Sequence, residues 1–211
     1  MDWVTVSALA TAAGTLVLAI ATFASVRSAN RAARVAELSV MANLRPLLVQ
    51  GRLDDASQKI GFAQEGEWLR LDGGHGAVRV DDGAILLAMS IRNVGQGIAV
   101  LHGWRIWTVE REELSDDVPD LAGFTRLTRD IFVPAGDIGF WQGTFRDPAV
   151  EEFAEVRRAV QGRRRLAIDV LYGDVEGGQR AVTRFGFSPA GDDQWLVAAG
   201  RVWNLDGHDP R

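Results

Sequence analysis

The first hydrophobic pattern along the chain is an uncharged run from Trp3 to Val26 that contains no proline and a single glycine. At about 1.5 Å per residue, a helix over this run extends roughly 36 Å, enough to cross a hydrocarbon core of about 30 Å with some tilt. A buried core helix is usually shorter and has a polar stripe. A cleaved signal peptide needs basic residues before its apolar run, and only Met1 and Asp2 precede this one. We predict a transmembrane helix over residues 1–26, with a core helix and a signal peptide as the alternatives.

Three arginines follow the apolar run within eight residues: Arg27, Arg31 and Arg34. Basic side chains next to a span are retained on the cytoplasmic side of the membrane. We therefore expect the N-terminus outside and residues 27–211 in the cytoplasm, with the chain in the inner (plasma) membrane of a bacterium. The same arginines lie where anionic lipid head groups would be, so the lipid bilayer is the first expected partner.

Small residues recur every four positions within the predicted span, at Ser7, Thr11, Thr15 and Ala19. Small side chains at this spacing let two helix backbones approach closely in lipid. The pattern predicts a helix–helix seam through which the chain associates with itself. The alternative is compositional, because alanine is abundant along the whole chain.

The polar segment that follows favours a helix as well. Residues 27–44 contain neither proline nor glycine and are rich in alanine, leucine and arginine, which are strong helix formers. Pro46 disfavours helical geometry at Arg45 and should end the helix there. We predict a juxtamembrane helical stalk over residues 27–45.

After Pro46 the pattern changes from helical to alternating. Apolar residues at every second position, separated by glycine- and asparagine-containing turns, are typical of antiparallel strands. Such short-turn strands favour a mainly β domain over residues 46–211, a two-sheet antiparallel β-sandwich. The predicted strands are Leu47–Leu53, Trp68–Leu71, Ala77–Val80, Ile85–Arg92, Ile98–Val109, Ile138–Phe145, Leu166–Tyr172, Ala181–Phe187 and Trp195–Leu205.

Two segments interrupt this pattern. Asp147 is expected to cap one inserted helix, with Pro148 at its first position and Gly162 at its end. Its predicted buried stripe is Phe153, Val156 and Val160. Residues 110–130 carry several acidic side chains and are predicted to form a solvated loop.

One predicted turn contains a motif that is part of a resemblance to a group of known proteins. The segment Arg92-Asn93-Val94-Gly95-Gln96-Gly97-Ile98-Ala99 follows a span, an arginine- and alanine-rich helix and an Arg-Pro junction. This layout resembles a loose group of uncharacterised bacterial single-pass membrane proteins that carry an immunoglobulin-like sandwich with an N-x-G-x-G-x-A turn. The resemblance covers most of the chain in layout. It implies a fold and a topology but no chemistry, because that group has no established activity.

The amino-acid composition excludes several classes of functional site. The absence of cysteine excludes disulfides, thiolate metal sites and cysteine nucleophiles. Residues 46–211 contain 19 basic and 26 acidic residues, so this part of the chain is acidic and is not expected to bind nucleic acid. Of the 23 basic residues, 22 are arginine, which is associated with a GC-rich bacterial genome.

The sequence contains few residues that could form a catalytic, metal-binding or phosphate-binding site. His75, His102 and His208 lack metal-ligand spacing. Gly73–Gly76 is not followed by a helix, as a phosphate-binding loop would be. The remaining candidates are loop carboxylates, a basic cluster at Arg163–Arg165 and the tryptophans; the paired loop carboxylates are Asp54-Asp55, Asp81-Asp82, Asp116-Asp117 and Asp192-Asp193.

These observations favour a membrane-tethered, non-catalytic interaction module with an unidentified protein partner and no cofactor. A ligand- or ion-sensing domain that uses the acidic loops is the alternative, followed by an enzyme of unrecognised type.

Overall fold

The structure is a computed structural model that describes residues 2–81, 83–108, 117–191 and 194–206. The chain divides into two compact units, Met1–Asn43 and Leu44–Arg211. The predicted boundary between the span and the stalk, after residue 26, lies inside the first unit.

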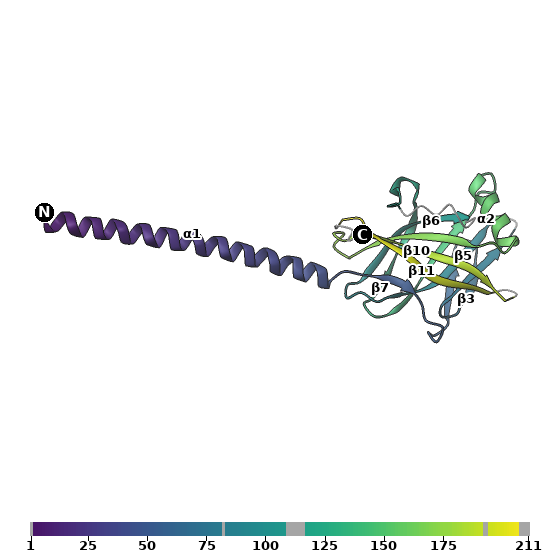
Figure 1. Cartoon of the computed structure of the whole chain (residues 1–211). Coiled ribbons are helices and arrows are strands. Elements are labelled where there is room, and N and C mark those ends of the chain that lie inside the picture. The colour runs from purple at the N-terminus through teal and green to yellow at the C-terminus, as the bar shows by residue number, and fades with distance from the viewer. Residues whose placement is uncertain (1, 82, 109–116, 192–193, 207–211) are drawn as a thin grey trace. The chain divides into compact units, whose positions relative to one another are not determined.

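The first unit is one helix, α1 (Trp3–Asn43) (Figure 1). Its first 35 residues, Trp3–Glu37, form a helix long and apolar enough to cross a membrane, and none of its most apolar window is buried against protein. The helix is unbroken because its sequence contains no proline and only one glycine, Gly14, which costs a helix interior about 1 kcal/mol. It ends at Asn43, two residues earlier than predicted.

The second unit is built from strands. In the described part of the chain they are β1 (Leu48–Gln50), β2 (Gln58–Phe62), β3 (Glu67–Leu71), β4 (His75–Val80), β5 (Ile85–Asn93), β6 (Ala99–Thr108), β7 (Thr125–Val133), β8 (Ile138–Phe145), β9 (Leu166–Gly173), β10 (Ala181–Ala190) and β11 (Gln194–Asn204). A short 3₁₀ turn, η1 (Leu121–Gly123), and the helix α2 (Glu151–Gln161) complete it.

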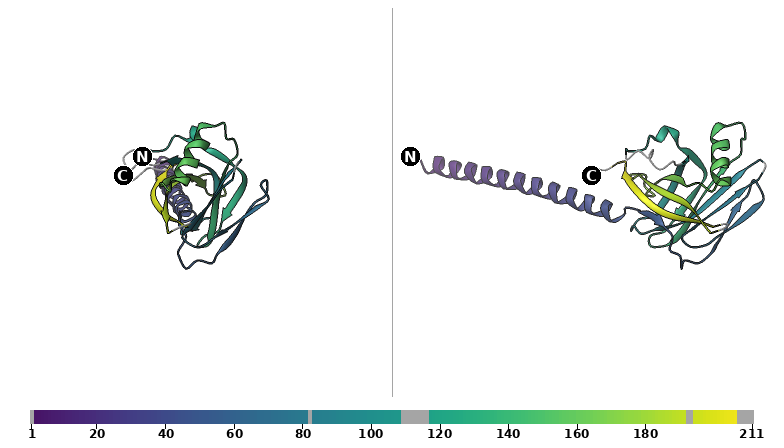
Figure 2. Two further views of the ribbon diagram at one scale, coloured as in Figure 1. Left: turned by 90° about the vertical axis from the view of Figure 1, so that its right-hand side faces the viewer. Right: turned by 45° about the vertical axis from the view of Figure 1, so that its right-hand side comes forward.

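Nine of these strands form one antiparallel sheet in the order β1-β5-β4-β11-β10-β9-β6-β7, with β8 also paired to β5. Because β4 and β8 both pair with residues 85–89, they lie on opposite edges of β5. The sheet curls so that its strands enclose a core (Figure 2). The prediction of an N-terminal helix followed by an antiparallel, sandwich-like β domain with one inserted helix is therefore confirmed.

Strand β5 is buried on both faces, which explains its continuous hydrophobicity. Ile85, Leu87, Met89 and Ile91 point into the main core. Leu86 and Ala88 point outward, under a separate two-stranded sheet of β2 and β3 that covers them with Ile60, Phe62, Leu69 and Leu71. β2 was not predicted, because its sequence QKIGF has only two large apolar residues.

The prediction for the start of the inserted helix was wrong. α2 begins at Glu151 after Val150, and Asp147 instead accepts a hydrogen bond from the Ala149 backbone in the preceding turn, at 2.9 Å. The helix buries Phe153, Val156 and Ala159 in the main core, with Val160 partly buried. Gly162 does cap its end, but the residue with left-handed geometry is the next one, Arg163, at φ 47°.

The predicted loop over residues 110–130 was also wrong in its second half. Residues 125–130 belong to β7, whose side chains are mostly exposed. β7 pairs with β6 with a register shift between Leu101 and Gly103. A strand with a single hydrogen-bonded neighbour and little buried surface has no need of apolar alternation, so the period-2 signal is missing. Residues 109–116 lie outside the described residues.

Candidate functional site

The residues proposed from sequence as topology signals project from the surface of α1. Arg27, Arg31 and Arg34 all have exposed side chains. At about 100° per residue they fall within an arc of about 60° around the helix. Glu37 is the only acidic residue between Trp3 and Asn43, so this arc carries a net positive charge.

The residues of the predicted seam are exposed on the same helix. Ser7, Thr11 and Thr15 lie on one side within an arc of about 80°, and Ala19 borders that arc. Thr22 and Ser25 fall within the same arc and were missed in the sequence, because they continue it at spacings of seven and three rather than four. We call Ser7, Thr11, Thr15, Thr22 and Ser25 the hydroxyl face.

Each of these hydroxyls donates to a backbone carbonyl of the preceding turn. Thr11 donates to Ser7 and Thr15 to Thr11, each at 2.9 Å. Ser7, Thr22 and Ser25 make equivalent bonds of 2.8 to 2.9 Å. A polar group in hydrocarbon must find its partner within the protein, so these bonds make the hydroxyl face compatible with a lipid environment.

The Asn-x-Gly-x-Gly turn holds the segment through which the chain enters the β domain. The buried Asn93 side chain accepts hydrogen bonds from the backbone of Leu47 and Gly95, at 3.1 and 3.0 Å. It donates to the carbonyls of Gly97 and Val133, at 2.7 and 3.0 Å. All four hydrogen-bonding positions of the amide are therefore used.

The glycines of this turn are needed for close approach. A Cβ at Gly97 would lie 1.6 Å from the Leu44 carbonyl oxygen, and one at Gly95 would lie 2.3 Å from that of Arg45. Val94 donates to the Leu47 carbonyl at 2.8 Å. We call this arrangement the entry clasp: Asn93, Gly95 and Gly97 with residues 44–47. The sequence motif that carried the family resemblance thus has a structural role.

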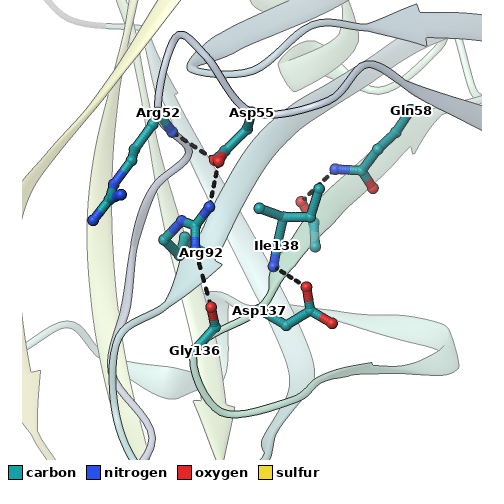
Figure 3. A network of polar contacts seen from close by, with 8 residues as sticks. Arg52, Asp55, Gln58, Arg92, Gly136, Asp137 and Ile138 are labelled. Atoms are coloured by element: carbon teal, nitrogen blue, oxygen red, sulfur yellow. Dashed lines mark hydrogen bonds and ion pairs between the residues drawn. The ribbon is translucent and has the colours of Figure 1, made fainter.

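A polar network lies next to the entry clasp (Figure 3). The carboxylate of Asp55 receives the backbone N–H of Arg52 at 2.7 Å and forms an ion pair with Arg92, which also donates to the Gly136 carbonyl at 3.0 Å. Burial alone would raise the pKa of Asp55. The hydrogen bonds from Arg92 and Arg52, together with their charges, outweigh burial and lower that pKa below its ordinary value.

A second ion pair lies on the outward face of the curled sheet. Asp169 is fully buried and receives a bidentate pair of hydrogen bonds from Arg184, at 2.7 and 2.8 Å. The indole N–H of Trp107 donates to the same carboxylate at 2.9 Å. The Arg184 guanidinium lies 4.9 Å from the ring centre of Trp203. The side chains of Asp169, Arg184 and Trp107 form hydrogen bonds with one another, which favours a structural role for them.

The other candidate residues are dispersed. The His75 ring lies 2.7 Å from the Gly73 carbonyl oxygen, and His102 lies in β6. Among the described residues, no group of three or more histidine, aspartate or glutamate side chains could hold a metal ion. Arg163 donates to the backbone carbonyls of Ala190, Gly191 and Gln194, where β10 ends and β11 begins. His208, Asp82, Asp116, Asp192 and Asp193 lie outside the described residues.

The tryptophan side chains of the β domain differ in how far they are buried. Trp104, Trp141, Trp195 and Trp203 are buried, and Trp107 is half-buried. Trp68 is 66% exposed and is the one strongly exposed tryptophan of the described β domain. It is paired with Gly61 in the β2–β3 hairpin, and its ring lies over that glycine. Its neighbours on the outward face are Lys59 and Arg70.

Comparison with known proteins adds no relative. No protein-family model matches the sequence, and no curated protein matches it significantly.

Proposed function

We propose that this protein is a membrane-tethered, non-catalytic interaction module with a cytoplasmic β domain. The observation that carries the proposal is α1, a helix with an exposed apolar stretch of spanning length whose hydroxyl face donates to backbone carbonyls within the helix. The structural bonds of three polar side chains in the domain support the non-catalytic part. Asn93 holds the chain entry, and Asp55 and Asp169 are held by arginines.

The topology of this tether follows from the three arginines. A reporter fused after Arg211 is expected to be active only if it functions in the cytoplasm. Replacing Arg27, Arg31 and Arg34 with glutamine should reduce this bias, because positive charge beside the span is what retains that side. Replacing Arg157, Arg158 and Arg164, far along the chain, is the matched control. A reporter active only outside the membrane would contradict the orientation.

We also propose that the span associates with a second copy through the hydroxyl face. Replacing Thr11 and Thr15 with leucine should hold the two backbones apart and lower the dimer signal in a membrane two-hybrid assay several-fold, while added hydrophobicity keeps the helix inserted. Ala13 and Ala24 lie on the opposite side of the helix, so the double change Ala13→Leu and Ala24→Leu is the matched control. Equal signals from both double variants would show that the small residues are compositional.

A further inference from the structure

The arginines share one side of α1 with three large apolar side chains. Leu16, Ile20 and Phe23 are exposed and fall within the same arc of about 80° as Arg27, Arg31 and Arg34. This side, which we call the arginine face, lies roughly opposite the hydroxyl face. It is an apolar strip that becomes cationic at one end.

The arginines of this face span a length comparable to the thickness of a phospholipid head-group layer. Arg27 and Arg34 are separated by about 10 Å along the helix axis, and the head-group layer of one leaflet is roughly 5 to 8 Å thick. A guanidinium binds phosphate oxygens in a bidentate manner. An acyl chain of the phospholipid would pack along Leu16, Ile20 and Phe23, while the phosphate of the same lipid reaches the arginines.

We propose that the arginine face binds anionic phospholipids, whose head groups are held by Arg27, Arg31 and Arg34. The proposal rests on the proposed membrane span and goes beyond it by assigning one face and one lipid class. Charge complementarity selects the occupant: the face carries three positive charges near a single carboxylate, Glu37. It also implies that a second copy packed on the hydroxyl face leaves these arginines pointing away from one another.

The test uses the absence of native cysteine. Full-length protein with a single Ile20→Cys or Thr22→Cys change is labelled with a fluorophore and reconstituted in phosphatidylcholine vesicles. One set of vesicles contains brominated phosphatidylglycerol as the quencher. A second set contains the same fraction of brominated phosphatidylcholine instead. Position 20 lies on the arginine face and position 22 on the hydroxyl face. We expect position 20 to prefer the anionic quencher about fivefold, the preference that roughly one basic side chain near an anionic surface gives, and position 22 to show none.

A charge-matched variant separates the face from total charge. Arg27, Arg31 and Arg34 become alanine while Ala29, Ala32 and Ala36, which lie on the side of the hydroxyl face, become arginine. The preference for the anionic lipid should then move to position 22. A preference of equal size at both positions, or quenching by both lipids alike, would overturn the proposal and leave the span intact. The absence of quenching by either lipid would contradict the span itself.

Discussion

Replacing Asn93 with alanine is expected to lower the free energy of unfolding of the β domain by about 3–5 kcal/mol. The change removes four hydrogen bonds, two of them with the carbonyls of Gly97 and Val133. Each polar group left buried without a partner costs about 1–3 kcal/mol. Urea denaturation followed by tryptophan fluorescence measures the effect, because six of the seven tryptophans lie in residues 44–211.

The same turn supplies the control. Gln96 is exposed, so Gln96→Ala should change stability by no more than about 0.5 kcal/mol. Asn93→Asp keeps the two accepting positions but directs a carboxylate oxygen at two carbonyl oxygens, so it should also destabilise strongly. An Asn93→Asp variant as stable as the parent would contradict the hydrogen-bond assignment in the entry clasp.

Removing Arg184 is expected to cost about 3–5 kcal/mol, the effect of breaking a buried ion pair from one side. In the Arg184→Ala variant the fully buried Asp169 carboxylate keeps only the Trp107 N–H among its side-chain partners described above. The same urea titration measures the loss, and exposed Arg70→Ala, which removes a surface ion pair with Asp72, is the control.

A double-mutant cycle distinguishes an ion pair from packing. Replacing Arg184 with methionine and Asp169 with leucine together removes both charges and keeps apolar volume, so it should recover much of the stability lost by either single change. If the two single losses simply add in the double variant, the residues are not coupled and the assigned pair is wrong.

The helix and most strands could be predicted from the sequence because their signals are local. The uncharged run from Trp3 to Val26 and the short apolar run of β5 are each continuous in the sequence, so each can be recognised without a tertiary structure. β2 and β7 could not be predicted in this way. β2 packs as a cover over another strand, and β7 is mostly exposed, so neither needs a continuous apolar pattern.

The candidate site was predictable only in part. The topology role of Arg27, Arg31 and Arg34 rests on their position directly after the apolar run and stays a prediction. The role of Asn93 could not be predicted, because its partners include Leu47 and Val133, which are distant in sequence. The sequence shows Asp55 only as one of a pair of loop carboxylates, and its pairing with Arg92, 37 positions away, appears only in the folded domain.

The pairing of β4 with β11 also sets an order for biosynthesis. These two strands join the halves of the curled sheet through Gly76 with Trp195 and His75 with Leu196. At about 5–20 residues per second, the ribosome needs roughly 6–24 seconds to proceed from β4 to β11. The β4 edge of the nascent chain therefore stays unpaired until β11 is made, whereas α1 is synthesised before either strand. If α1 spans a membrane as proposed, anchoring precedes closure of the domain by β11.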